Sequence, residues 1–338
     1  MPTFCRHNRL IQNCPICSRE QDVEMRPMVS PGGHTVRAPR SAAVSGTSTS
    51  TGAGGGTRSG SARGGRGSGG LRVRQLSRAA EDGVRSALVP GLRSGADAQR
   101  LAEEMAFAAT RLERLQSEPP GLYAEVADPS LPIEERTWLA FLIAYLGPLD
   151  GPDPFAGIEQ ARTPWSPGEA PRLDDVPTGP RTSHEAERGQ RTIEAYRVWA
   201  RRAGSQEAAF TGDRGWAPER RFARVFERLT LPALHRGARF DLLATLGQLG
   251  VYELSAGALG LGGNDTVTLA AKRILGIGDT MLLERRAAEL AIACELPLES
   301  LDLGLFNWER GSRSGLGLDP DTEPDPDLVE TARAALGV

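Results

Sequence analysis

Two segments with helical apolar spacing flank a Gly-Ile-Gly turn near the C-terminus, and this pattern constrains the fold more than any other stretch. Apolar residues recur at intervals of three and four, as on one face of a helix. Their positions are Val267, Ala270, Ala271, Ile274 and Leu275 before the turn and Leu283, Ala287, Leu290, Ala291 and Cys294 after it. Glycine takes positive φ without steric cost and ends a helix readily. The stretch 264–294 is therefore predicted to be two helices joined by a tight hairpin.

This pattern resembles a helix-hairpin-helix element. In such an element the N–H groups of the hairpin and of the following helix form a concave donor site, which suits a nucleic-acid phosphate and requires no particular side chain. Cations flank the glycines on both sides. The residues predicted to bind DNA are Lys272, Arg273, Gly276, Ile277, Gly278 and Arg285. The alternative is an ordinary pair of helices with a glycine at the first C-terminus.

A second motif lies at the N-terminus, in residues 1–19. Its C-x-H-x6-C-x2-C spacing supplies Cys5, His7, Cys14 and Cys17. These four soft ligands are enough to close a tetrahedral zinc shell, and a module this small would take its folding energy from the metal. We expect a structural Zn²⁺ in a zinc knuckle. The alternatives are a C-x-x-C redox pair and free cysteines in a mobile terminus.

Residues 20–70 are rich in glycine, serine and arginine and poor in apolar residues. Such a composition cannot bury a core, so a disordered linker is expected. An arginine-glycine tail of this kind can bind nucleic acid nonspecifically, but it contains no aromatic residue on which a base could stack. A flexible tether is the favoured interpretation.

The region 71–338 is predicted to be one all-α domain, because runs with strand-like alternation are missing from its sequence. Residues 133–147 contain the longest apolar run of the sequence and should form a central buried helix. The proline-rich stretch 148–184 is expected to be a long loop, in which Phe155 and Trp165 either anchor onto the core or stack on a base. Helices are expected at 71–88, 96–117, 133–147, 185–203, 217–230, 239–249 and 326–336.

Several function classes lack the residues they would need. The sequence contains no P-loop motif and no evident Ser-His-Asp signature. No signal peptide is recognised, and the longest apolar run, 138–146, is too short to span a bilayer. Three of the four cysteines lie in the first seventeen residues, which is unlike a secreted disulfide framework. A cytoplasmic protein without a membrane partner is expected.

Beyond the hairpin, the sequence resembles the helix-hairpin-helix DNA glycosylase superfamily. Within it, the chain is most similar to the third clade of the α-glutamyl/putrescinyl-thymine pyrophosphorylase group. The stretches that carry the resemblance are RFDLLATLGQLGVYEL, AAKRILGIGD, LERRAAELA, PLESLDLGLFNW, ERTWLAFLIAYLGPLDGPDPF and FCRHNRLIQNCPIC. The resemblance implies a two-lobed helical fold that acts on a flipped, hypermodified thymine- or uracil-type base in DNA. It also implies, as partners, other enzymes of a DNA-modification system.

The resemblance implies a catalytic role for Asp302. Glycosylases of this superfamily place an aspartate about two dozen residues after the hairpin glycines, and Asp302 occupies that position. It would stabilise a cationic sugar or activate a nucleophile. The lysine that lyase-type relatives carry after the hairpin is missing here, as are the iron–sulfur cysteines of some relatives. Asp302 as a plain helix N-cap is the alternative.

Two other function classes are also compatible with the sequence. The chain can be a non-catalytic DNA-binding module that docks through the hairpin and the zinc knuckle. It can also be an interaction protein whose helices bind another protein. The environment of Asp302 separates these hypotheses, because a catalytic carboxylate must line a cleft.

Overall fold

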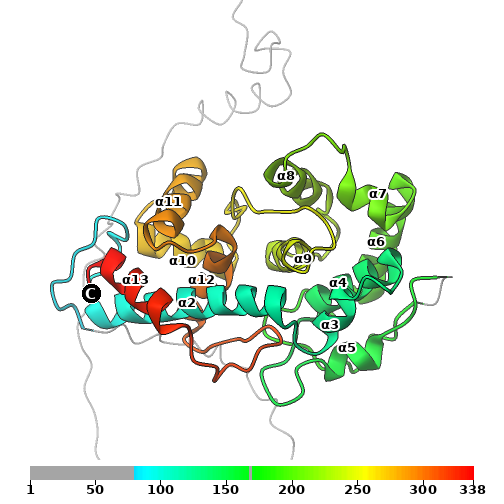
Figure 1. The fold of residues 1–338 in the computed structure, drawn as a ribbon, viewed down its shortest axis with the longest axis horizontal. Coiled ribbons are helices and arrows are strands. Elements are labelled where there is room, and N and C mark those ends of the chain that lie inside the picture. The colour runs from blue at the N-terminus through cyan, green and yellow to red at the C-terminus, as the bar shows by residue number, and fades with distance from the viewer. Residues whose placement is uncertain (1–79, 167–169) are drawn as a thin grey trace, which may run out of the picture. The chain divides into compact units, whose positions relative to one another are not determined.

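Helices alone form the regular secondary structure of residues 80–166 and 170–338, which the computed structural model describes (Figure 1). The prediction of an all-α fold is confirmed for this part of the chain. The zinc knuckle 1–19, with Cys5, His7, Cys14 and Cys17, and the linker 20–70 lie outside the described residues. The helices are α2 (Gly95–Ser117), α3 (Leu122–Ala127), α4 (Ile133–Leu146), α5 (Ala156–Ala161), α6 (Gly189–Ala203), α7 (Gln206–Thr211), α8 (Pro218–Arg228), α9 (Arg236–Gln248), α10 (Thr266–Leu275), α11 (Thr280–Ala293), α12 (Leu298–Arg310) and α13 (Pro326–Leu336).

Helix α4 is the buried centre of one set of helices, as its apolar sequence predicts. All its residues from Thr137 to Leu146 are buried. Its aromatic side chains lie along one side, and Tyr196 of α6 stacks on Phe141 with ring centroids 3.7 Å apart. Helix α4 also packs on α9, and α8 packs between α7 and α9. Aromatic stacking thus ties helices from distant parts of the sequence into one core.

A second set of helices is built on α2, the long helix that runs across Figure 1. Helices α12 and α13 both pack against it, and α10 packs on α12. The contact with α12 is close because Gly304 faces the backbone of α2, where a Cβ would lie 2.9 Å from the Cα of Met105. The two sets meet where α2 contacts α9.

Most of the helices predicted from the sequence are present. The prediction of a helix at 71–88 is wrong for residues 80–88, which are not helical. The carboxylate of Asp82 accepts the N–H groups of Val84 at 3.1 Å and Gly95 at 2.8 Å. A side chain that satisfies nearby amides competes with helix formation. The sequence pattern does not predict the short helices α3 and α7.

The two aromatic residues of the loop 148–184 anchor it to the core. Phe155 is buried and meets Tyr123 edge-on, with centroids 5.4 Å apart. Trp165 is half-buried and lies 5.4 Å from Trp138. Of the two roles considered for these residues, the anchoring one is therefore confirmed.

Among the described helices, none combines the length and the apolar character that a bilayer crossing needs. The central helix α4 is apolar, but it has only 14 residues. A single bilayer span takes about 20.

Candidate nucleic-acid interface and buried charge cluster

Helices α10 and α11 are joined by a four-residue connection, Gly276 to Asp279. Gly276 ends α10 in the left-handed conformation, with φ of 66°, and its N–H donates to the Lys272 carbonyl. Each helix begins at an aspartate: Asp265 accepts from the N–H of Thr268, and Asp279 accepts from that of Leu282. The turn is thus bounded by the Gly276 C-cap of α10 and the Asp279 N-cap of α11, while Asp265 fixes the start of α10.

The segment before α2 holds the C-terminal end of α10. The N–H of Gly91 donates to the carbonyl of Ile274 at 2.8 Å. A Cβ at Gly91 would lie 1.8 Å from the carbonyl oxygen of Arg273, so only glycine allows this approach. The base of the hairpin is therefore held against the segment before α2.

The tip of the hairpin is open to solvent. Gly276 and Gly278 are exposed, Ile277 is half-exposed, and a Cβ at Gly278 would meet no atom within 4 Å. Among the described residues, no acceptor is assigned to the N–H groups of Ile277, Gly278 and Met281. Free donors at the start of a 14-residue helix form a site that favours an anion.

The cations predicted to flank this site are partly engaged within the protein. Arg273 pairs with Glu309 of α12 at 2.7 Å, and Arg285 pairs with Glu289 at 2.9 Å on the surface of α11. Lys272 is half-buried, and its Nζ donates to the Gly263 carbonyl at 3.2 Å. Lys272 can exchange this neutral acceptor for a phosphate more readily than Arg273 can leave a carboxylate.

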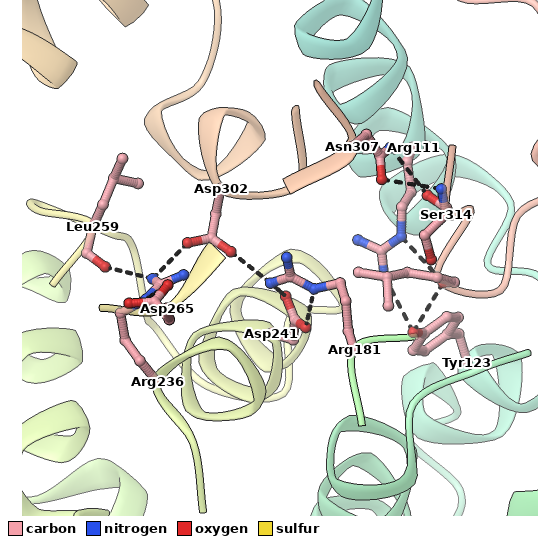
Figure 2. Close-up of polar contacts among 11 residues, drawn as sticks. Arg111, Tyr123, Arg181, Arg236, Asp241, Leu259, Asp265, Asp302, Asn307 and Ser314 are labelled. Carbon is pink, nitrogen blue, oxygen red and sulfur yellow. Dashed lines mark hydrogen bonds and ion pairs between the residues drawn. The ribbon is translucent and has the colours of Figure 1, made fainter. Parts of the chain in front are cut away.

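Asp302 lies in the second turn of α12, and its side chain is directed into the protein (Figure 2). It is 1% exposed. Its Oδ1 accepts from Arg181 Nη2 at 2.5 Å and its Oδ2 from Arg236 Nη1 at 2.6 Å. Since Pro297 is the N-cap of α12, the alternative role of Asp302 as a helix N-cap is wrong.

Two further carboxylates complete the cluster. Arg181 binds Asp241 of α9 through Nε at 2.8 Å and Nη2 at 2.7 Å. Arg236, the first residue of α9, donates from Nε to Asp265 at 2.9 Å. Because Asp265 also caps α10, the cluster connects the start of the hairpin unit to α9 and α12.

Electrostatics favour the charged forms of Arg181, Arg236 and Asp265. Burial opposes the charge on Arg181, but Asp241 and Asp302 outweigh it, so the pKa of Arg181 is raised. The pKa of Arg236 is raised in the same way, against its burial, mainly by Asp302. For Asp265, burial is again the largest opposing effect, yet Arg236 and Thr268 lower its pKa. The arrangement is a chain of mutually stabilised ions.

The space beside Asp302 is small. The void that Asp241 and Asp302 help to line measures about 10 Å³, which is at the limit for one water molecule. Both oxygens of Asp302 are already in ion pairs. The carboxylate can therefore reach a base only if an arginine releases it and the surrounding residues move. One donor is spare, since Nη2 of Arg236 is buried and has no partner among the described residues.

The sequence identifies Asp302 and the hairpin as candidate sites. It does not identify the charged residues that surround Asp302, which are Arg181, Arg236, Asp241 and Asp265. One signal was available for Arg236. It shares a helical face with the buried residues Phe240 and Leu243, at i+4 and i+7, and a charge on an apolar face requires a partner. Nothing comparable distinguishes Arg181 in its loop.

The part of the chain that the structure describes contains no group of three or more His, Cys, Asp or Glu side chains that could hold a metal ion. The zinc prediction at Cys5, His7, Cys14 and Cys17 concerns residues outside that part and stays a prediction.

Comparisons with protein-family models, curated proteins and solved structures find no match.

Proposed function

We propose that this protein is a DNA-binding enzyme of the helix-hairpin-helix, glycosylase-like class, and that it acts on a flipped, modified thymine- or uracil-type base. The observation that carries the proposal is the exposed connection between α10 and α11. This element contains N–H groups without an acceptor among residues 80–166 and 170–338, and it also contains Lys272 and the unobstructed Gly278. Backbone donors recognise phosphate without regard to sequence, as docking on DNA requires.

The chemical step rests on Asp302 and on its two arginines. In the resting cluster the charge of Asp302 is balanced, so it can neither stabilise a cationic sugar nor activate a nucleophile. An anionic group of the substrate would compete with Asp302 for Arg181 and Arg236. Once the surrounding residues move, the spare Nη2 of Arg236, which is buried in the resting cluster, is a further donor for that group. Release of Asp302 would then couple substrate entry to catalysis.

A non-catalytic DNA-binding module is the second candidate, and one observation favours it. The carboxylate of Asp302 is buried and holds two ion pairs, as expected for a structural residue. In that case the cluster only fixes α9, α10 and α12, and the hairpin alone carries the function.

The experiment that tests the proposal combines binding with product analysis. Duplex oligonucleotides containing thymine, hydroxymethyluracil or hypermodified pyrimidines are titrated against the full chain by fluorescence anisotropy. The same mixtures are then analysed by nucleoside mass spectrometry. Binding together with a changed or released base supports the enzyme. Binding to all duplexes without any change of base supports the binding module, and lack of binding to every duplex contradicts both.

A further inference from the structure

A cavity of about 310 Å³ opens beside the first half of α4. Its walls come from the end of α3, the loop before α4, α4 itself and the segment after α5. The inner wall is apolar and consists of the buried side chains of Trp138, Leu139 and Leu142. Leu131 and Pro164 line it nearer the surface. This size is at the lower end of small-molecule sites, which are typically apolar with a few polar groups.

Two of the four charged residues in the wall neutralise one another. Arg162 donates from Nη1 to Oε1 of Glu125 at 3.1 Å and from Nη2 to Oε2 at 2.5 Å. Both carboxylate oxygens of Glu125 are thus occupied by a bidentate guanidinium. This pair contributes no net charge to the cavity.

The other two charges are adjacent in sequence and only partly satisfied. Glu135 accepts the N–H of Trp165 at 2.9 Å with Oε2, which leaves Oε1 available. Arg136 donates from Nε to Val126 at 2.7 Å and from Nη2 to Ala127 at 3.2 Å, which leaves Nη1 available. Neither forms an ion pair with another described residue. Both are half-buried and line the cavity.

We propose that this cavity binds a small zwitterion with an apolar side chain, namely a hydrophobic α-amino acid such as leucine or phenylalanine. The ammonium group is recognised by Glu135, the carboxylate by Arg136, and the side chain packs on Trp138. A phosphate group fits poorly, because the wall holds as many carboxylates as guanidiniums. This site is independent of the proposed action on DNA.

The test measures binding of L-leucine and L-phenylalanine to the full chain by isothermal titration calorimetry at millimolar ligand concentrations. Leucinamide lacks the carboxylate, and 4-methylpentanoate lacks the ammonium group. Each analogue is expected to bind at least about tenfold more weakly than leucine, because one charged contact is lost. Equal binding of leucine and both analogues overturns the assignment to a zwitterion, and so does lack of binding by both amino acids.

Two variants and a matched control locate the site. Glu135→Gln keeps an oxygen for the Trp165 N–H but loses the charge, so leucine should bind about tenfold more weakly. Leu131→Trp fills the mouth from a position that is already 37% exposed, so the fold should persist and binding should be lost. Glu159→Gln changes an exposed carboxylate of α5 outside the cavity wall and should bind leucine as the wild type does. Leucine binding that Leu131→Trp leaves unchanged overturns the proposal, even if Glu135→Gln proves unstable.

Discussion

At the hairpin between α10 and α11, backbone donors and Gly278 face solvent, whereas around Asp302 the arginine donors are directed at carboxylates inside the protein. The hairpin donors are therefore open to solvent without rearrangement, as the proposed phosphate contact requires. The cluster must first exchange one of its internal partners. This difference means that DNA binding and any chemistry at Asp302 should respond separately to mutation.

The largest effect is expected from Asp302→Asn, measured as the free energy of unfolding in urea. The substitution leaves Arg181 and Arg236 buried without the charge that both contact. Removing one partner of a buried ion pair costs about 3–5 kcal/mol. As a control, Asp150→Asn removes the more exposed pair with Arg310 and should cost less than about 1 kcal/mol.

The same variant tests the separation of binding from chemistry. If Asp302→Asn remains folded, it should bind DNA as the wild type does, because it leaves the hairpin unchanged. On a confirmed substrate its turnover should fall by orders of magnitude. Wild-type turnover in this variant would show that the reaction does not use the carboxylate.

How far the sequence predicts this molecule depends on the range of the interactions involved. The hairpin follows from local rules, since apolar spacing, Gly276 and the two aspartate caps all lie within thirty residues. The helix expected at 71–88 is missing over residues 80–88 because the Asp82 carboxylate accepts the N–H of Gly95, a contact that no periodicity reveals. Likewise, Arg181 and Asp302 are 121 residues apart, so their ion pair is a property of the fold.

An intermediate effect is expected for the cations at the hairpin. Lys272→Ala should weaken DNA binding several-fold and reduce the slope of log K against log salt by about one, as for one lost phosphate contact. Arg273→Ala should change that slope less, because Glu309 already holds Arg273. Anisotropy titrations at several salt concentrations measure both. A larger change in slope for Arg273→Ala would mean that this ion pair opens on DNA.

A smaller effect, a gain in DNA affinity, is expected from Asp279→Asn. Asparagine caps a helix about as well as aspartate, so the start of α11 should persist. The substitution removes a negative charge from the proposed phosphate site, and DNA affinity should rise about two- to fivefold at low salt. The affinity of both proteins is compared at low and high salt. A loss of affinity would argue that the Asp279 charge is itself required.

The smallest effect concerns acid stability. The pKa of the Asp265 carboxyl is lower in the folded protein than in the unfolded chain. Its contribution to the free energy of unfolding is therefore fully present above the pKa of the unfolded chain. That contribution is lost as the pH falls through the lower pKa of the folded protein. The free energies of unfolding of Asp265→Asn and of the wild type are measured in urea over a range of pH. The difference between the two proteins should be constant above about pH 5 and should shrink below about pH 4. A difference that grows in acid would contradict the sign of this shift.

The most direct test of the account is the DNA affinity of Gly278→Val, measured by fluorescence anisotropy beside Gly215→Val. Both glycines are exposed, neither has positive φ, and a Cβ at either position meets at most an ordinary contact. Both variants should therefore unfold at nearly the wild-type urea concentration. If the hairpin holds a phosphate, Gly278→Val should bind every duplex about tenfold more weakly or worse, and Gly215→Val should bind normally. Wild-type affinity in a folded Gly278→Val protein would show that the hairpin is only a turn.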